Sequence, residues 1–163
     1  MSLIVILDSD FLSAFLKIEQ MPLIRSLYQV DTVAVPPAVY REIALTDLLP
    51  RLNALTWIQV VAPSHSQIDA LTRDGNFRRL GAGEQEAIAL AIERSESVLL
   101  GNDNQARRIA TKLGVRVINI PAFLLACKQT GLVNQKSMFT IIDDLREKDF
   151  FGFRQTDLDL LIG

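Results

Sequence analysis

The sequence predicts an α/β protein in which helices cover both faces of a parallel sheet of about five strands. Short apolar runs alternate along the chain with longer segments of helical character, which is the order that βαβ units produce. The first run, residues 3–7, is apolar at every position, as expected for a strand buried on both faces. Because 49% of the 163 residues are hydrophobic, the chain can also build the core that such a fold needs.

The elements follow one another without an intervening linker or repeat, so we expect a single domain spanning residues 1–163. The predicted strands are residues 3–7, 32–35, 57–61, 97–100 and 116–118. Helical patterns cover residues 11–19, 22–28, 38–45, 47–55, 66–73, 83–94, 103–113, 121–129 and 135–148, with one more short helix after Gly152. Asn102 is expected to cap the helix that ends at Gly114. Residues 73–79 are expected to form a loop, because they contain an Asp-Gly-Asn sequence.

The composition excludes several classes of protein. No apolar run reaches the roughly 18 residues that a membrane span requires. Acids follow the first apolar run directly, which argues against a signal peptide. The single cysteine, Cys127, excludes an internal disulfide and is expected to be a small apolar residue on a helix. These features favour a cytoplasmic protein without a membrane association.

Acidic residues occupy positions that this fold can bring together. In open parallel sheets, ligands bind beyond the carboxyl ends of the strands. Asp8 and Asp10 follow the first strand, and Asp103 follows the fourth. Glu42 lies one turn into a predicted helix, and Glu84 opens another. An acid at a helix start is often only a cap or a partner of the helix dipole, so it is the combination that indicates a site.

Four blocks of the sequence together resemble the PIN-domain family, in a prokaryotic, toxin-type branch. They are Val-Ile-Leu-Asp-Ser-Asp at 5–10, Val-Pro-Pro-Ala-Val-Tyr-Arg-Glu-Ile at 35–43, Gly-Glu-Gln-Glu-Ala-Ile-Ala-Leu-Ala at 83–91, and Leu-Leu-Gly-Asn-Asp-Asn-Gln-Ala-Arg-Arg at 99–108. The resemblance covers essentially the whole chain, and the second and third blocks are its most specific parts. It implies a PIN-like three-layer α/β/α fold.

The resemblance also implies a metal-dependent ribonuclease, which in many relatives is the toxin of a toxin–antitoxin pair. The implied catalytic residues are Asp8, Glu42, Glu84 and Asp103, and the implied ligands of Mg²⁺ or Mn²⁺ are Asp8, Glu84 and Asp103. Asp10 and Asn102 are secondary candidates. The family's fourth acid falls at Asn102 here, with the acid Asp103 one residue later. Either Asn102 or Asp103 can therefore take the position of the family's fourth acid.

Carboxylates suit this chemistry, since Mg²⁺ and Mn²⁺ prefer oxygen ligands. The net charge of −2 does not by itself indicate a nucleic-acid-binding protein, but basic residues flank the acidic blocks. The arginines expected to contact RNA phosphates are Arg78, Arg79, Arg107 and Arg108. Glu86, two positions after Glu84, is expected to be solvated. A dimer and an antitoxin protein are further partners that the resemblance implies.

Two alternatives stay open. The first is a non-catalytic PIN-like module that binds RNA or a protein through a degraded metal site, and Asn102 is the residue that favours it. The second is an unrelated phosphate-binding or signalling domain in which Asp8 and Asp10 alone hold a metal. The second predicts no role for Glu42 or Glu84, and the chain lacks a glycine-rich phosphate loop after a strand.

Overall fold

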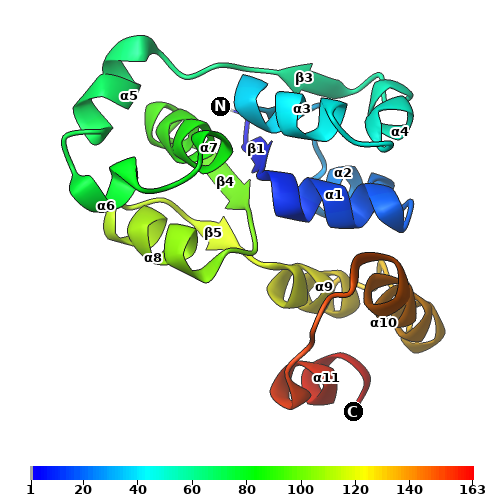
Figure 1. The fold of residues 1–163 in the computed structure, drawn as a ribbon. Coiled ribbons are helices and arrows are strands. Elements are labelled where there is room, and N and C mark those ends of the chain that lie inside the picture. Colours follow the sequence, from blue (N-terminus) through cyan, green and yellow to red (C-terminus); the bar gives the residue numbers. More distant parts are fainter. Residues whose placement is uncertain (1) are drawn as a thin grey trace.

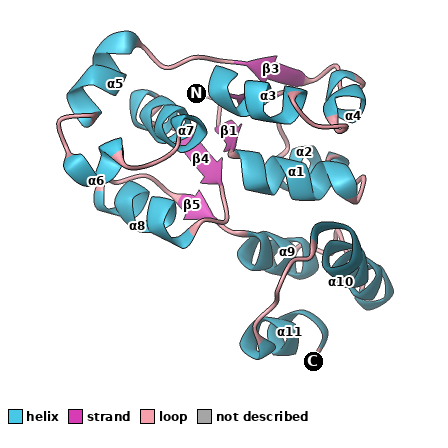
Figure 2. Ribbon diagram, in the orientation of Figure 1, coloured by secondary structure: helices cyan, strands magenta, loops and turns pink. Residues whose placement is uncertain are grey.

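The computed structural model describes residues 2–163 and shows a five-stranded sheet between layers of helices (Figures 1 and 2). The strands are β1 (Ile4–Leu7), β2 (Val33–Val35), β3 (Ile58–Val60), β4 (Ser97–Leu100) and β5 (Val117–Ile118). The helices are α1 (Ser9–Lys17), α2 (Pro22–Tyr28), α3 (Pro37–Ala44), α4 (Leu49–Asn53), α5 (His65–Leu71), α6 (Gly75–Arg78), α7 (Ala82–Glu93), α8 (Asn104–Lys112), α9 (Ile120–Gln129), α10 (Gln135–Asp149) and α11 (Gln155–Ile162). The predicted α/β/α fold class is confirmed.

All strand pairs are parallel, and the strand order is β3-β2-β1-β4-β5. The chain therefore builds outward from β1 in one direction and then returns to add β4 on the other side. Ligands of open α/β sheets bind at this point of reversal. In the register of β1 and β4, Leu7 lies opposite Leu100, and the Asp8 N–H donates to the Leu100 carbonyl at 2.9 Å. The residues that follow these two strands are thus held side by side.

The two faces of the sheet pack against different sets of helices. Val5 and Leu7 share a core with the apolar faces of α1, α2, α9 and α10. Ile6 and Leu99 point to the other face, where they pack with residues of α6, α7 and α8. This alternation explains why the β1 sequence is apolar throughout: each side chain meets a helix layer whichever way it points. Cys127 is fully buried in the first of these cores, on α9, as expected.

The start of α8 differs from the prediction. Asp103, and not Asn102, is the N-cap of this helix, and its Oδ1 accepts the Ala106 N–H at 2.8 Å. The helix ends as predicted, with Gly114 in the left-handed region at φ +83°. Asn and Asp are equally good caps, so propensity could not decide between neighbouring residues.

The predicted loop at residues 73–79 is wrong in its middle, because residues 75–78 form the short helix α6. Asp74 caps the short helix α6 by accepting the N–H groups of Asn76 and Phe77 at 2.8 and 3.4 Å. Phe77 is fully buried against α7 and α8. This burial stabilises a helical turn where the local sequence predicts a loop. α6 directly precedes α7 and therefore fixes where Arg78 and Arg79 lie on the surface.

The last helices form an extension of the first helix layer. α11 packs on α9 and α10, and Figure 1 shows it at the end of the molecule away from the N-terminus. Within residues 2–163, the helices are too short or too polar to cross a membrane.

Candidate metal centre

Asp8 is the most buried acid near the carboxyl end of the sheet. It directly follows β1 and caps α1, with its Oδ1 accepting the Ser9 N–H at 2.8 Å. Only 5% of the residue is exposed. Gly101, the residue after β4, lies beside it: a Cβ at Gly101 would stand 3.4 Å from the Asp8 Cβ and 3.5 Å from Oδ2. A side chain at Gly101 would thus be in van der Waals contact with Asp8, on the side where both residues line a hollow.

Glu84 reaches the same region from the first turn of α7. Its Oε1 accepts the Gly81 N–H at 3.2 Å, so the side chain turns back over the start of its own helix. Asp8, Glu84 and Asp103 line a common hollow of about 10 Å³. That is space for about one water-sized group.

Glu42 approaches α7 from α3, at a point where α7 has no side chain. A Cβ on Gly83 would stand 2.8 Å from the Glu42 Oε1 and 3.1 Å from the Val39 Cγ2. Gly83 is buried in the helix and lacks the helix propensity of alanine, so its place here is explained by this close approach. Glu42 is exposed, and it lies against Gly83, the residue that directly precedes Glu84 in α7.

The start of α1 and the loop after β4 bring three more polar side chains to this edge. Asp10 Oδ1 accepts the Phe11 N–H at 2.7 Å and the Asn102 N–H at 3.4 Å, which ties the ends of β1 and β4 together. Asn102 Oδ1 accepts the Ile120 N–H at 3.2 Å, at the start of α9. Asp103 is exposed and lines the hollow, whereas the oxygen of Asn102 is engaged with the backbone.

Burial and the charges of neighbouring acids raise pKa values at this edge of the sheet. The pKa of Asp8 is raised to about 7, first by burial and then by the charges of Asp10, Glu84 and Glu42, against the lowering effect of the Ser9 N–H. The pKa of Glu84 is also raised, chiefly by burial, with the charges of Asp103, Asp10 and Glu42 adding to the shift. Acids from four segments therefore repel one another at one edge of the sheet, which a bound cation would relieve.

The donor set fits a hard divalent cation, although the carboxylates do not close on one point. In residues 2–163, no three His, Cys, Asp or Glu side chains are arranged to coordinate a single ion together. The acids instead surround the hollow from several sides. Mg²⁺ commonly keeps several of its water molecules and takes only one or two protein carboxylates. Asp8, Glu84 and Asp103 are the residues that would hold such an ion, partly through its water molecules.

Glu86 is a residue that the sequence reasoning missed. It is not solvated as expected: its Oε1 accepts the Ala38 N–H at 2.8 Å. α3 starts after Pro36 with Pro37, which has no N–H, so Ala38 carries the first N–H of this helix that needs a partner. Glu86 on α7 thus caps the helix that carries Glu42. A contact between residues 48 positions apart leaves no local sign in the sequence.

Replacing Glu86 with alanine should therefore disturb Glu42 without touching it. We expect a loss of about 1 kcal/mol in the free energy of unfolding, as for other lost helix caps. Mn²⁺-dependent cleavage of RNA should fall by roughly 10- to 100-fold, as for partners that orient a residue of the site. Glu86→Gln keeps an oxygen acceptor and is the matched control. Equal losses of cleavage in both variants would show that the charge of Glu86, and not its cap of α3, is what matters.

The four predicted RNA-contacting arginines do not lie alike. Arg107 lines the hollow with Asp8, Glu84 and Asp103. Arg78 and Arg79 are exposed on the α6 side, where the Gln85 Nε2 donates to the carbonyls of Phe77, Arg78 and Leu80 at 3.0–3.3 Å. Arg108 is exposed on α8 and does not line the hollow.

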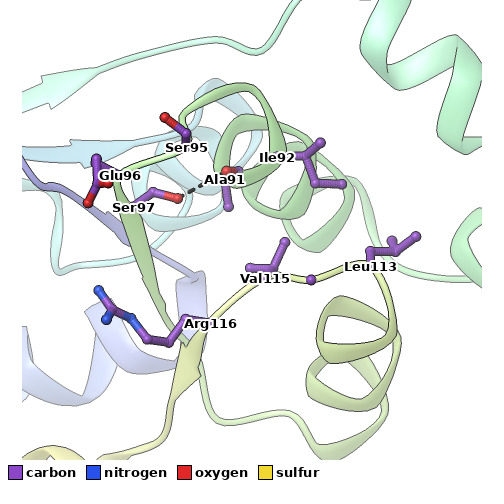
Figure 3. A pocket seen from close by; sticks show the side chains of 9 residues that line it. Ala91, Ile92, Ser95, Glu96, Ser97, Leu113, Val115 and Arg116 are labelled. Carbon is purple, nitrogen blue, oxygen red and sulfur yellow. Dashed lines mark hydrogen bonds between the residues drawn. The ribbon is translucent and has the colours of Figure 1, made fainter.

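A larger hollow of about 330 Å³ lies at the opposite, amino end of β4 and β5 (Figure 3). Ser97, Val115 and Arg116 are among its lining residues, and the Ser97 Oγ donates to the Ala91 carbonyl at 3.0 Å. The clustered acids are at the other end of the same strands. Size alone therefore does not identify the candidate site in this fold.

The protein is a three-layer α/β/α domain whose acids gather at the carboxyl end of a parallel sheet. The family model DUF3368, described as a PIN domain, matches residues 4–156. The chain belongs to this PIN-domain family, and its fold is therefore of the nuclease type. A comparison with curated proteins found no match to the chain.

Proposed function

We propose that this protein is a metal-dependent endoribonuclease that hydrolyses phosphodiester bonds of RNA, with Mg²⁺ or Mn²⁺ as its cofactor. The observation that carries the proposal is the convergence of acids from separate segments on the carboxyl end of the sheet, expressed in the raised pKa of Asp8. A cluster of carboxylates in this position costs folding free energy, so a functional reason for it is needed. RNA as the substrate rests on the family resemblance.

Each acid has a distinct part in this proposal. Asp8, Glu84 and Asp103 hold the metal ion, and Glu42, which lies against Gly83 of α7, is a further catalytic acid. When bound, the ion supplies a polarised water and offsets the charge on the phosphate. Asp8 is fixed by the Ser9 N–H, which leaves Oδ2 directed toward Gly101 and the hollow. Arg107, and more distantly Arg78, Arg79 and Arg108, would hold phosphates of the RNA backbone.

The alternative function is a non-catalytic module that binds RNA or a protein. Asn102 favours it, because its side-chain oxygen accepts the Ile120 N–H and brings no charge to the site. A narrower form of the main proposal is that the protein is the toxin of a toxin–antitoxin pair, acting as a homodimer and inhibited by an antitoxin protein.

Cleavage of labelled mixed RNA separates these functions. With Mn²⁺ or Mg²⁺ the wild type should cleave, and with EDTA it should not. Asp8→Asn should reduce cleavage by several orders of magnitude, because it removes a charged ligand while keeping the shape of the side chain. Asp69→Asn, which changes an exposed acid on α5, is the control and should cleave like the wild type. RNA binding without metal-dependent cleavage would favour the non-catalytic module.

A further inference from the structure

A second hollow lies next to the acid site, between α8, α9 and α11. Its volume is about 230 Å³, which is smaller than the roughly 300–1,000 Å³ of pockets that enclose small molecules. Its lining includes Arg107, Asn119, Pro121, Leu125, Arg154 and Leu160. This size suits one unit of a longer chain better than a whole ligand.

Arg107 joins the two hollows. The same side chain lines the acid site with Asp8 and Glu84, and lines the second hollow with Arg154. A polymer bound at the acid site would therefore pass Arg107 on its way into the second hollow. Arg107 is half-buried, and its Nη2 lies 3.5 Å from the Asn104 Oδ1, so its guanidinium is held near this boundary.

The lining combines an apolar floor with polar groups at the edge. Pro121, Leu125 and Leu160 supply apolar surface, and Leu160 is 56% exposed. Two guanidinium groups and the Asn119 amide stand around them. Unstacked bases of single-stranded RNA are held in this way, by contact with flat or apolar surfaces and with arginine planes, together with hydrogen bonds to their edges.

Arg154 differs from Arg107 in charge balance. Its Nε and Nη2 donate to the two carboxylate oxygens of Asp157 at 3.2 and 3.1 Å, and Asp157 is 9% exposed. A guanidinium has five N–H donors, so donors and the flat face remain available. Because Asp157 offsets its charge and fixes its plane, Arg154 offers a surface for stacking more than a net positive charge.

α11, which forms one wall, is fastened in place. The Lys128 Nζ on α9 donates to the Leu160 carbonyl at 2.6 Å, and the Gln135 Nε2 on α10 donates to the Ile162 carbonyl at 3.3 Å. The second hollow is thus formed before any ligand binds. Leu160 also lies beyond residue 156, where the match to the family model ends.

We propose that the second hollow binds one nucleotide of a single-stranded RNA whose neighbouring phosphate lies at the acid site. Arg107 contacts the phosphate between the two positions, and Arg154 lies against the base. This inference rests on the proposed ribonuclease function, since it names how that substrate is held.

Fluorescence anisotropy with a short, labelled single-stranded RNA in EDTA tests the subsite without cleavage. Arg107→Gln should flatten the slope of log affinity against log salt by about 0.7, the value for one phosphate contact on a single strand. Arg154→Gln should lower affinity roughly tenfold, as for a lost stacking surface, and leave the slope unchanged. Arg116→Gln, at the opposite end of the sheet, is the control and should bind like the wild type.

Crosslinking of the wild type to RNA containing 4-thiouridine gives a second measurement that does not depend on how the variants fold. Crosslinks should map to α9 or α11. Unchanged affinity in both variants, or crosslinks confined to α6 and α7, would overturn the subsite. Binding of an acidic peptide in place of RNA, lost in the same two variants, would also overturn it and reassign the hollow to a protein partner.

Cleavage with Mn²⁺ is scored separately. RNA held through Arg107 and Arg154 but never cleaved would contradict the ribonuclease proposal and support the subsite as an RNA-binding site. If the protein cleaves RNA in the presence of metal, but neither Arg107→Gln nor Arg154→Gln changes its affinity for RNA, only the subsite would be overturned.

Discussion

Asp8→Asn should stabilise the metal-free protein at neutral pH while it removes the response to metal. A folded-state pKa of about 7, against the ordinary 3.8, means that the folded state disfavours the ionised form of Asp8 by about 4 kcal/mol relative to the unfolded state. Between these two values the folded state binds more protons than the unfolded state, so stability is highest at the low end and is lost as the pH rises toward 7. Asparagine never ionises, and it still caps α1 well. Its stability should therefore vary less with pH.

Urea denaturation in EDTA at pH 5 and pH 8 measures this difference. The contribution of Asp8 to the free energy of unfolding of the wild type should fall by about 2–3 kcal/mol from pH 5 to pH 8. This fall should be absent in Asp8→Asn. Adding Mn²⁺ at a hundred times its dissociation constant should then raise the wild-type stability by about 2.7 kcal/mol and leave the variant unchanged. If the stability of the wild type depended on pH in the same way as that of Asp8→Asn, Asp8 would not be buried among the other acids as described.

Asp103→Asn should weaken Mn²⁺ binding far more than Asn102→Asp changes it. Asp103 lines the hollow with Asp8 and Glu84, whereas the side-chain oxygen of Asn102 accepts the Ile120 N–H. Loss of a ligand should cost more than the 10- to 100-fold typical of residues that only orient one. Asparagine at position 103 keeps the cap of α8, so the helix itself should remain.

Calorimetric titration of Mn²⁺ into both variants decides between the two positions. A tighter site in Asn102→Asp, together with wild-type affinity in Asp103→Asn, would assign the family's fourth position to residue 102. In that case the hydrogen bond to Ile120 would have to yield to the metal. No effect in either variant would place the ion on the Asp8 and Glu84 side of the hollow.

The sequence predicts the fold well where patterns are local. The apolar run of β1, the strand Ser97–Leu100 and the helix Pro22–Tyr28 all follow from periodicity, β-rich composition and the position of proline. The convergence of Asp8 and Asp103 also follows, because adjacent parallel strands end at one edge. Their metal-binding roles stay predictions.

Contacts between distant segments explain what the sequence could not predict. The role of Glu86 depends on how α3 meets α7, and the burial of Phe77 converts an Asp-Gly loop sequence into α6. The assignment of the α8 cap to Asp103 depends on where β4 ends, which is a matter of one residue. The second hollow needs α11 to fold back on α9, and no periodicity encodes that docking.

The first turn of α7 gives the protein an unusual sensitivity to changes in chain length. Four consecutive residues there serve four partners: Gly83 admits Glu42, Glu84 faces the acid site, Gln85 holds the end of α6, and Glu86 caps α3. One inserted residue within this turn would rotate everything on one side of it by about 100° relative to the other. No single substitution could restore the lost contacts. Related chains that diverge freely elsewhere should therefore keep the length of this segment fixed.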